Sequence, residues 1–291
     1  MIWKLKINRV LLPYCILIIF SSCSKKENSA PSISNEISYS FLVAGHVYGD
    51  PLAISIGFYP PFKAQFSYIQ EFPKLIHAIY TGDVVRNNLN EVQWDSAITD
   101  MQTLGIDYHV SAGNHDRGEV FLDRFGSYYY SFIEGSDLFI ILNSDNWKIE
   151  GEQKDFLKSS LTSIENVSNI FLFCHELIWW SPDSIFQNIG VNYAPHYPGS
   201  TNYWAEIDPI LQNTNKPVYL FSGDVGATEP ASPFAYYKYS NVRLVASGMG
   251  RAIDSNYLIV DVYTNGEVKI NLKATEGEAD RLGDITLYEI P

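Results

Sequence analysis

Side chains able to bind a metal ion or transfer a proton follow five apolar runs of the 291-residue chain. The five clusters are Gly45-His46, Gly82-Asp83, Gly113-Asn114-His115-Asp116, His175-Glu176 and Gly223-Asp224. A single Gly-Asp after a strand is usually a turn, and a lone histidine is more often a core residue than a ligand. The repetition of such clusters at five strand ends indicates one shared site, because imidazole and carboxylate groups suit divalent metal ions and acid–base chemistry.

The runs before these clusters have the composition of buried β-strands. We expect strands at 39–44, 76–80, 108–111, 170–174 and 218–221. A helix is predicted after Asn90, with Trp94, Ile98, Met101 and Leu104 at helical spacing and Gly105 at its end, and a second helix is predicted over 151–164. Hairpins are expected at 128–143 and 234–273, with a turn at Thr264-Asn265-Gly266-Glu267. This order predicts an α/β protein with mixed sheets and functional groups at the carboxyl ends of strands.

In order and approximate spacing, the five clusters resemble the blocks of the calcineurin-like metallophosphoesterase family. Those blocks run Asp-x-His, Gly-Asp, Gly-Asn-His-Asp/Glu, His, and Gly-His-x-His, and the resemblance covers most of residues 39–250. Its most specific element is Gly113-Asn114-His115-Asp116. The resemblance implies a four-layer αββα sandwich, with two mixed β-sheets flanked by helices and a metal centre at the strand ends.

The resemblance also implies roles for individual residues. Asp83 matches the carboxylate that bridges two metal ions in the family, and Asn114 and His175 match ligands of the second ion. His115 matches a general acid or phosphate contact, and we expect Asp116 to orient its imidazole.

Two blocks depart from the family pattern. Ala44 stands where the first block has a carboxylate, and Asp224 and Gly226 stand where the fifth block has two histidines. Positions 44 and 226 belong to the same ion in the family, so only His46 and Asp83 remain for it, and two protein ligands are too few for a durable divalent site. We therefore predict one divalent metal ion of the Mn, Fe, Zn or Mg class, with two ions as the alternative. Its expected ligands are Asp83, Asn114, His175 and Asp224, and His46 is expected to contact substrate or a weakly held second ion.

The charge of the chain constrains its partners. There are 20 Lys and Arg residues against 33 Asp and Glu residues, and the formal net charge is −13. This balance argues against nucleic acid as a partner. One divalent ion facing Asp83 and Asp224 is formally neutralised, so a phosphate group needs further cations. The substrate-binding candidates, which follow the motif loops, are Arg86, Arg117 and Arg251.

The first residues have the pattern of an export signal. Three basic residues precede the apolar run 10–20, which is too short to span a bilayer, and the run leads through two serines to Cys23. We expect residues 1–22 to be a lipoprotein signal peptide, Cys23 to be lipidated, and residues 23–37 to form a flexible tether to a phosphoesterase domain at 38–291. Ordinary secretory cleavage is the alternative. With lipidation, the protein is expected in the bacterial cell envelope, in contact with the membrane through the lipid anchor only.

Two functions fit these observations. The first is a metal-dependent hydrolase acting on a phosphoester of the cell envelope. The second is a non-catalytic protein of the same fold that binds an envelope polysaccharide or protein partner through an aromatic rim. The rim candidates are Trp179, Trp180, Tyr193, His196 and Trp204, for which core packing is the simpler interpretation. A serine esterase fits poorly, because no serine lies in a recognisable nucleophile turn. The sequence contains no assembly signal, so the oligomeric state is left open.

Overall fold

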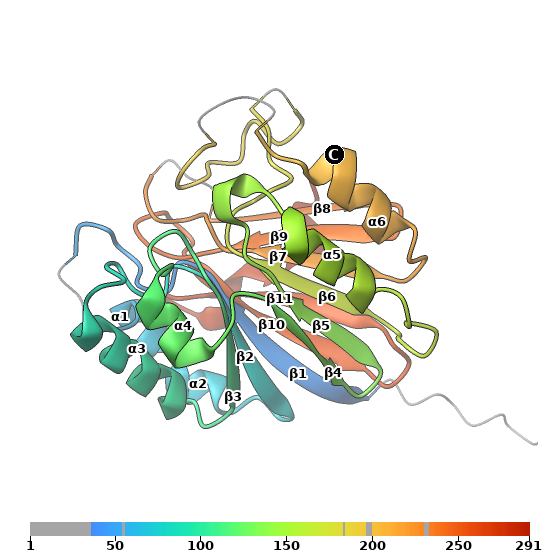
Figure 1. Ribbon diagram of the computed structural model, residues 1–291. Coiled ribbons are helices and arrows are strands. Elements are labelled where there is room, and N and C mark those ends of the chain that lie inside the picture. The colour runs from blue at the N-terminus through green and yellow to red at the C-terminus, as the bar shows by residue number, and fades with distance from the viewer. Residues whose placement is uncertain (1–35, 54–55, 183, 196–199, 230–232) are drawn as a thin grey trace, which may run out of the picture. The chain divides into compact units, whose positions relative to one another are not determined.

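The fold of residues 34–291 is built on two six-stranded β-sheets (Figure 1). The computed structural model describes residues 36–53, 56–182, 184–195, 200–229 and 233–291. The signal peptide, Cys23 and most of the predicted tether lie outside the described residues, as does His196. The first strand begins at Ile37, at the last position of the predicted tether.

The two sheets are mixed, as predicted. The first has the strand order β12-β11-β10-β1-β2-β3, and the second has the order β4-β5-β6-β7-β9-β8. The strands of the first sheet are β1 (Ile37–Ala44), β2 (Leu75–Thr81), β3 (Asp107–Ser111), β10 (Asn256–Tyr263), β11 (Val268–Ala274) and β12 (Gly283–Asp284). Those of the second are β4 (Tyr130–Glu134), β5 (Asp137–Ile141), β6 (Ile170–Cys174), β7 (Val218–Ser222), β8 (Phe234–Tyr239) and β9 (Val242–Ser247). All five strands predicted individually are present.

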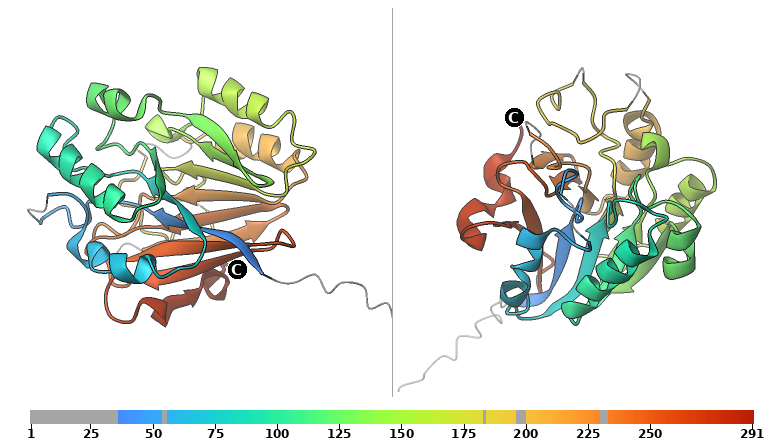
Figure 2. Two further views of the ribbon diagram at one scale, coloured as in Figure 1. Left: turned by 90° about the horizontal axis from the view of Figure 1, so that it is seen from below. Right: turned by 90° about the vertical axis from the view of Figure 1, so that its left-hand side faces the viewer.

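Helices cover the outer face of each sheet (Figures 1 and 2). Beside the first sheet lie α1 (Pro60–Lys63), α2 (Phe66–Ile69), α3 (Glu91–Thr103) and α4 (Glu119–Phe125), and beside the second lie α5 (Gly151–Ser160) and α6 (Asp208–Gln212). Short helical turns occur at Asp145–Trp147, Tyr203–Ile207, Ala279–Leu282 and Ile285–Tyr288. No helix in the part of the chain that the structure describes is long and apolar enough to cross a bilayer.

Three hydrophobic cores separate the four layers. Alternate residues of β1 point to opposite faces: Phe41 packs between the two sheets against Phe139 and Phe171, whereas Leu42 packs in the core that includes Trp94 of α3. The third core holds α5 and α6 against the second sheet. Burial on both faces explains why the strand sequences are apolar without alternation. The predicted αββα sandwich is confirmed.

The two predicted helices are present, and one is shorter than expected. The Asn90 side chain accepts hydrogen bonds from the backbone N–H groups of Val92 and Gln93, at 3.1 and 3.2 Å, and this caps α3 as predicted. The second helix, α5, ends at Ser160 rather than at Ile164. Serine and threonine dominate the sequence 159–163, and their low helix propensity accounts for the early end.

The predicted hairpins at 234–273 are divided between the sheets. Strands β8 and β9 form an antiparallel pair in the second sheet, and β10 and β11 form one in the first. The turn predicted at 264–267 joins β10 to β11, with Gly266 at φ +84°. The chain therefore crosses from one sheet to the other between Ser247 and Asn256, and this crossover passes the cluster of site residues described below.

Candidate metal centre

The site is formed by loops at the carboxyl ends of parallel strands. Strands β1, β2 and β3 are parallel to one another, and so are β5, β6, β7 and β9. The carboxyl ends of parallel strands share one edge of a sheet, so the loops after them meet there. All five polar clusters found in the sequence occupy such loops.

Glycines let these loops approach one another closely. A Cβ atom at Gly82 would lie 2.5 Å from Nδ1 of His175, and one at Gly113 would lie 2.3 Å from Oδ1 of Asp83. Neither position leaves room for a side chain. His46 and Asp83 have positive φ angles of 51° and 53°, a conformation that non-glycine residues rarely adopt and that is often found at functional sites.

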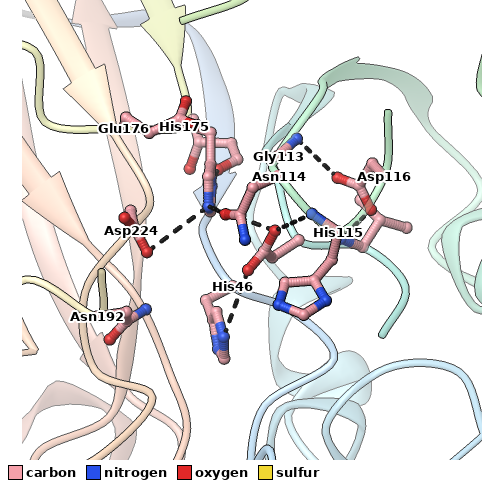
Figure 3. Close-up of polar contacts among 12 residues, drawn as sticks. His46, Gly113, Asn114, His115, Asp116, His175, Glu176, Asn192 and Asp224 are labelled. Carbon is pink, nitrogen blue, oxygen red and sulfur yellow. Dashed lines mark hydrogen bonds and ion pairs between the residues drawn. The ribbon is translucent and has the colours of Figure 1, made fainter. Parts of the chain in front are cut away.

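The four predicted metal ligands lie together, and Figure 3 labels Asn114, His175 and Asp224 among them. Ligand atoms of Asp83, His175 and Asp224 are all within 4.8 Å of one another, and all three residues are buried. Oδ1 of Asn114 lies 3.2 Å from Nε2 of His175. Two carboxylates, an imidazole and an amide oxygen form a donor set that suits a divalent cation.

Asp83 lies between two histidines. Its Oδ1 is 3.3 Å from Nε2 of His175, and its Oδ2 is 3.5 Å from Nε2 of His46. In each histidine, Nδ1 contacts a backbone carbonyl, that of Thr81 at 2.8 Å for His175 and that of Met249 at 2.9 Å for His46. A carbonyl can only accept a hydrogen bond, so Nδ1 carries the proton and, in the neutral ring, Nε2 keeps a lone pair for a metal ion.

A complete second site is not formed beside His46. Ala44 is a buried strand residue, and a Cβ at Gly226 would meet the carbonyl carbon of Gly248 at 2.9 Å, so no side chain fits there. Asp50, the nearest carboxylate along the chain, accepts a hydrogen bond from the backbone N–H of Leu52 and is not among the clustered ligands. Within the described residues, His46 and Asp83 are therefore the candidate ligands at this side.

Burial and mutual charge shift the pKa values of the three clustered groups and of His46. Burial disfavours the imidazolium of His175, but Asp83 and Asp224 outweigh it and raise its pKa to about 10. Burial and the Asp83 charge raise the pKa of Asp224 to about 7. Although burial opposes it, His175 together with His46 holds the pKa of Asp83 well below its usual range. Burial lowers the pKa of His46 to about 4, despite the attraction of Asp83.

The Asp224 carboxylate supports a metal ion in this position. Its Oδ2 is buried and has no hydrogen-bond partner of ordinary geometry among the described residues, although the neighbouring Asn192 side chain opposes the rise of the Asp224 pKa. A buried carboxylate oxygen without a partner is costly, and a cation bound between Asp224 and Asp83 would satisfy it. The residues present therefore fit a divalent ion.

Asp116 does not orient His115, which corrects the expectation from the sequence. Its carboxylate accepts hydrogen bonds from the backbone N–H groups of Val84, Val85 and Gly113 at 2.8–3.0 Å. The carboxylate is fully buried and closes the loop after β2 against the loop after β3. His115 instead has Nδ1 at 2.9 Å from the backbone oxygen of Arg86.

The three candidate arginines have different surroundings. Arg86 is exposed and donates to the backbone oxygen of Ala53, and Arg251 is exposed in a separate cavity lined by Tyr59 and Arg281. Arg117 alone of the three borders the cavity of about 400 Å³ that includes Asn114. Neither Arg86 nor Arg251 belongs to that cavity.

Two residues of the site escaped the sequence analysis in whole or in part. Glu176 belongs to the cluster His175-Glu176, but the sequence did not indicate a role for it. Asn192 lies beside Asp224 in Figure 3, and its backbone N–H donates to the Asp224 carbonyl at 3.0 Å. Nothing in the local sequence distinguishes Asn192, because it approaches the site from a long loop after β6. Of the rim candidates, Trp179 is fully buried in the core and Trp204 is 40% exposed.

Comparison with known proteins agrees with this architecture. The family model for calcineurin-like phosphoesterases matches residues 46–248, and the chain belongs to this family. The chain is similar in structure to a purple acid phosphatase from yellow lupin, with a TM-score of 0.60 at 12% identity. The match covers 84% of this chain and 52% of the lupin protein, so the chain spans about half the length of that relative.

Two bacterial structures are also similar. One is a predicted phosphoesterase from Streptococcus pneumoniae, with a TM-score of 0.41 at 11% identity over 84% of this chain and 95% of that one. The other is a putative 5'-nucleotidase from Staphylococcus aureus, with a TM-score of 0.40 at 11% identity over 83% of this chain and 55% of that one. No curated protein sequence matches the chain. The family model and the lupin structure establish the phosphoesterase fold, and the geometry of Asp83, His175 and Asp224 provides a candidate divalent-metal site.

Proposed function

We propose that this protein is a metal-dependent phosphoester hydrolase of the cell envelope with one well-formed metal site. The observation that supports it most directly is the buried cluster of Asp83, His175 and Asp224, whose ligand atoms lie within 4.8 Å of one another beside the amide of Asn114. A divalent ion at this cluster would acidify a water molecule and neutralise charge on phosphoryl oxygens.

The chain's own residues supply orientation and proton transfer. Thr81 and Met249 fix the ring planes of His175 and His46 through their backbone oxygens. Because Nδ1 of His115 donates to the Arg86 carbonyl, Nε2 is the ring nitrogen that faces a leaving group, and it can give a proton only when the ring is the imidazolium. The His115 ring packs against Tyr48, with ring centroids 5.4 Å apart, and Tyr48 in turn packs against His46.

The test is metal content per chain after purification without chelators, measured by elemental analysis beside an assay with p-nitrophenyl phosphate and bis-p-nitrophenyl phosphate. One tightly held metal ion with turnover is the expected result. Two ions would show that positions 44 and 226 are compensated by other groups. Turnover that persists in full after chelation would refute the proposal.

The second candidate is a non-catalytic binding protein of the same fold. The lack of ligands at positions 44 and 226 favours it, whereas the intact loop from Gly113 to Asp116 opposes it. Retention of the purified protein on insoluble envelope polysaccharide, without turnover of either phosphoester, would favour this candidate.

We propose that export and lipidation at Cys23 place the protein in the envelope. The support is the charged, apolar and small-residue pattern of residues 1–23. Labelling of growing cells with a radioactive fatty acid should mark the full chain and not a Cys23→Ala variant. Equal labelling of both, or of neither, would contradict lipidation at this position.

A further inference from the structure

Arg117 and Glu176 form a largely buried ion pair next to the candidate metal centre. Nη2 of Arg117 lies 2.6 and 2.8 Å from the two carboxylate oxygens of Glu176. The Arg117 side chain is 17% exposed and that of Glu176 is 5% exposed. The remaining donors of Arg117 contact Asn143, at 2.8 Å, and Asp145, at 3.2 Å. The guanidinium therefore faces two carboxylates and an amide oxygen.

This ion pair joins the loops that carry two candidate ligands. Glu176 directly follows His175 at the end of β6, and Arg117 lies three residues after Asn114 in the loop after β3. Across the same junction, Asn114 Oδ1 is 3.2 Å from His175 Nε2. The ion pair and the contact between Asn114 and His175 therefore connect the same two loops.

A third loop fixes the position of Glu176. Ser144, in the loop after β5, donates its hydroxyl to the Glu176 carboxylate and accepts a hydrogen bond from the Glu176 backbone N–H at 2.9 Å. Asn143 is held in turn by two hydrogen bonds with Gln153 of α5, at 2.6 and 2.7 Å. The ion pair is thus connected to the helical layer of the second sheet.

The charge of Arg117 is already balanced within the protein. Glu176 and Asp145 raise its pKa above the ordinary value in spite of burial. A phosphate group would have to compete with the carboxylates of Glu176 and Asp145 for the N–H groups of Arg117, and both oxygens of Glu176 already accept from the guanidinium. The assignment of Arg117 as a phosphate contact, made from the sequence, is therefore not favoured by its surroundings.

We propose that Arg117 and Glu176 are positioning residues, which hold Asn114 and His175 at the separation that a single metal ion requires. This inference rests on the proposed function, because it takes Asn114 and His175 as metal ligands. The pair acts through these ligands and does not itself contact the ion. Loss of such outer contacts in metal sites commonly weakens metal affinity by about 10–100-fold.

The experiment measures the dissociation constant of Mn²⁺ and of Zn²⁺ by competition with a chromophoric chelator. The variants are Glu176→Gln, which keeps the size and the Ser144 contact, Arg117→Lys, Arg117→Met, and the double variant Arg117→Met/Glu176→Gln. Glu176→Gln and Arg117→Met are expected to weaken metal binding by about 10–100-fold. The double variant is expected to lose no more than the larger single loss, because each change removes the same contact. Arg117→Lys is expected to fall between wild type and Arg117→Met.

The matched control is Arg124→Met. Arg124 forms an ion pair with Glu91 and Asp95 of α3, away from the candidate ligands, and its removal should leave metal affinity unchanged. If Glu176→Gln and Arg117→Met bind Mn²⁺ and Zn²⁺ as tightly as the wild type does, the inference is wrong and the proposed function still stands. The same affinity combined with a raised KM for p-nitrophenyl phosphate would identify Arg117 as a phosphate contact instead. Failure of the wild-type protein to bind either ion would refute the proposed function, and the inference with it.

Discussion

Substitution of Asp224 by asparagine should stabilise the metal-free protein and remove most of the stability that the wild type gains from a metal ion. Asparagine keeps the size of the side chain and one oxygen but removes the charge. In the metal-free protein the pKa of Asp224 is raised from 3.8 to about 7, chiefly by burial. The Asp224 carboxyl therefore ionises at a higher pH in the folded protein than in the unfolded chain. Stability from this group is present below its unfolded pKa and is lost as the pH rises through about 7.

The size of the effect follows from that shift. One pKa unit corresponds to 1.36 kcal/mol, so the ionised carboxylate costs the folded state about 4 kcal/mol at pH 8. A buried amide without full hydrogen bonding costs about 1–3 kcal/mol of its own. Asp224→Asn should therefore raise the free energy of unfolding of the metal-free protein by about 1–3 kcal/mol. With metal at 100 times its dissociation constant, the wild type gains about 2.7 kcal/mol, and the variant should lose most of this gain.

The assay is urea unfolding at pH 8, in chelator and then in excess Mn²⁺, followed by circular dichroism. Asp123→Asn is the control, because Asp123 is exposed on α4 and its substitution should change neither measurement. The reasoning is refuted if Asp224→Asn is less stable than wild type in chelator, or if it gains as much stability from metal as the wild type does.

Three further results are expected. Gly82→Ala should abolish tight metal binding in an equilibrium assay, because the new Cβ would lie 2.5 Å from Nδ1 of His175. Gly105 has a similar positive φ angle, +69°, but open space around it, so Gly105→Ala should lower the free energy of unfolding in urea by only about 1–2 kcal/mol. Asp116→Ala leaves three backbone N–H groups without their acceptor, so it should lower the free energy of unfolding by at least about 3 kcal/mol, and a loss below 1 kcal/mol would contradict this role. Burial lowers the pKa of His109 from 6.5 to about 4, so on acidification the unfolded chain binds a proton at a higher pH than the folded protein does. The free energy of unfolding should therefore fall as the pH is lowered from 6.5 to about 4. The His109→Gln variant should lose less stability over the same range of pH.

Much of the fold could be predicted because the strands are buried on both faces. Their apolar runs, each ended by a polar cluster, gave the strand positions directly, and parallel order brought the clusters together. The pairing of β8 with β9 and of β10 with β11 in separate sheets was not predictable. The sequence of a hairpin indicates which strand residues are apolar and where the turn lies, but it does not indicate which sheet the two strands join.

The candidate ligands were predictable for a different reason. Asp83 and His175 each belong to a short cluster of metal-binding residue types at the end of a strand, and a metal site requires such clusters to meet. The error at Asp116 arose because a carboxylate next to a histidine in sequence need not face it. The loop turns Asp116 toward the backbone of Val84 and Val85, while His115 reaches the Arg86 carbonyl. The role of Glu176 depends on Arg117, 59 residues away, and such pairings appear only once the loops are placed.

The buried thiol of Cys174 provides an intrinsic measure of how often the site opens. Cys174 is the last residue of β6 and immediately precedes His175, and burial raises its pKa to about 12. Only the thiolate reacts with alkylating reagents, so the folded protein should react very slowly. The reaction must then pass through a state in which the end of β6 has separated from its neighbours. Its rate in native buffer reports the free energy of that local opening, and a metal ion held by His175 should slow it in proportion to its occupancy.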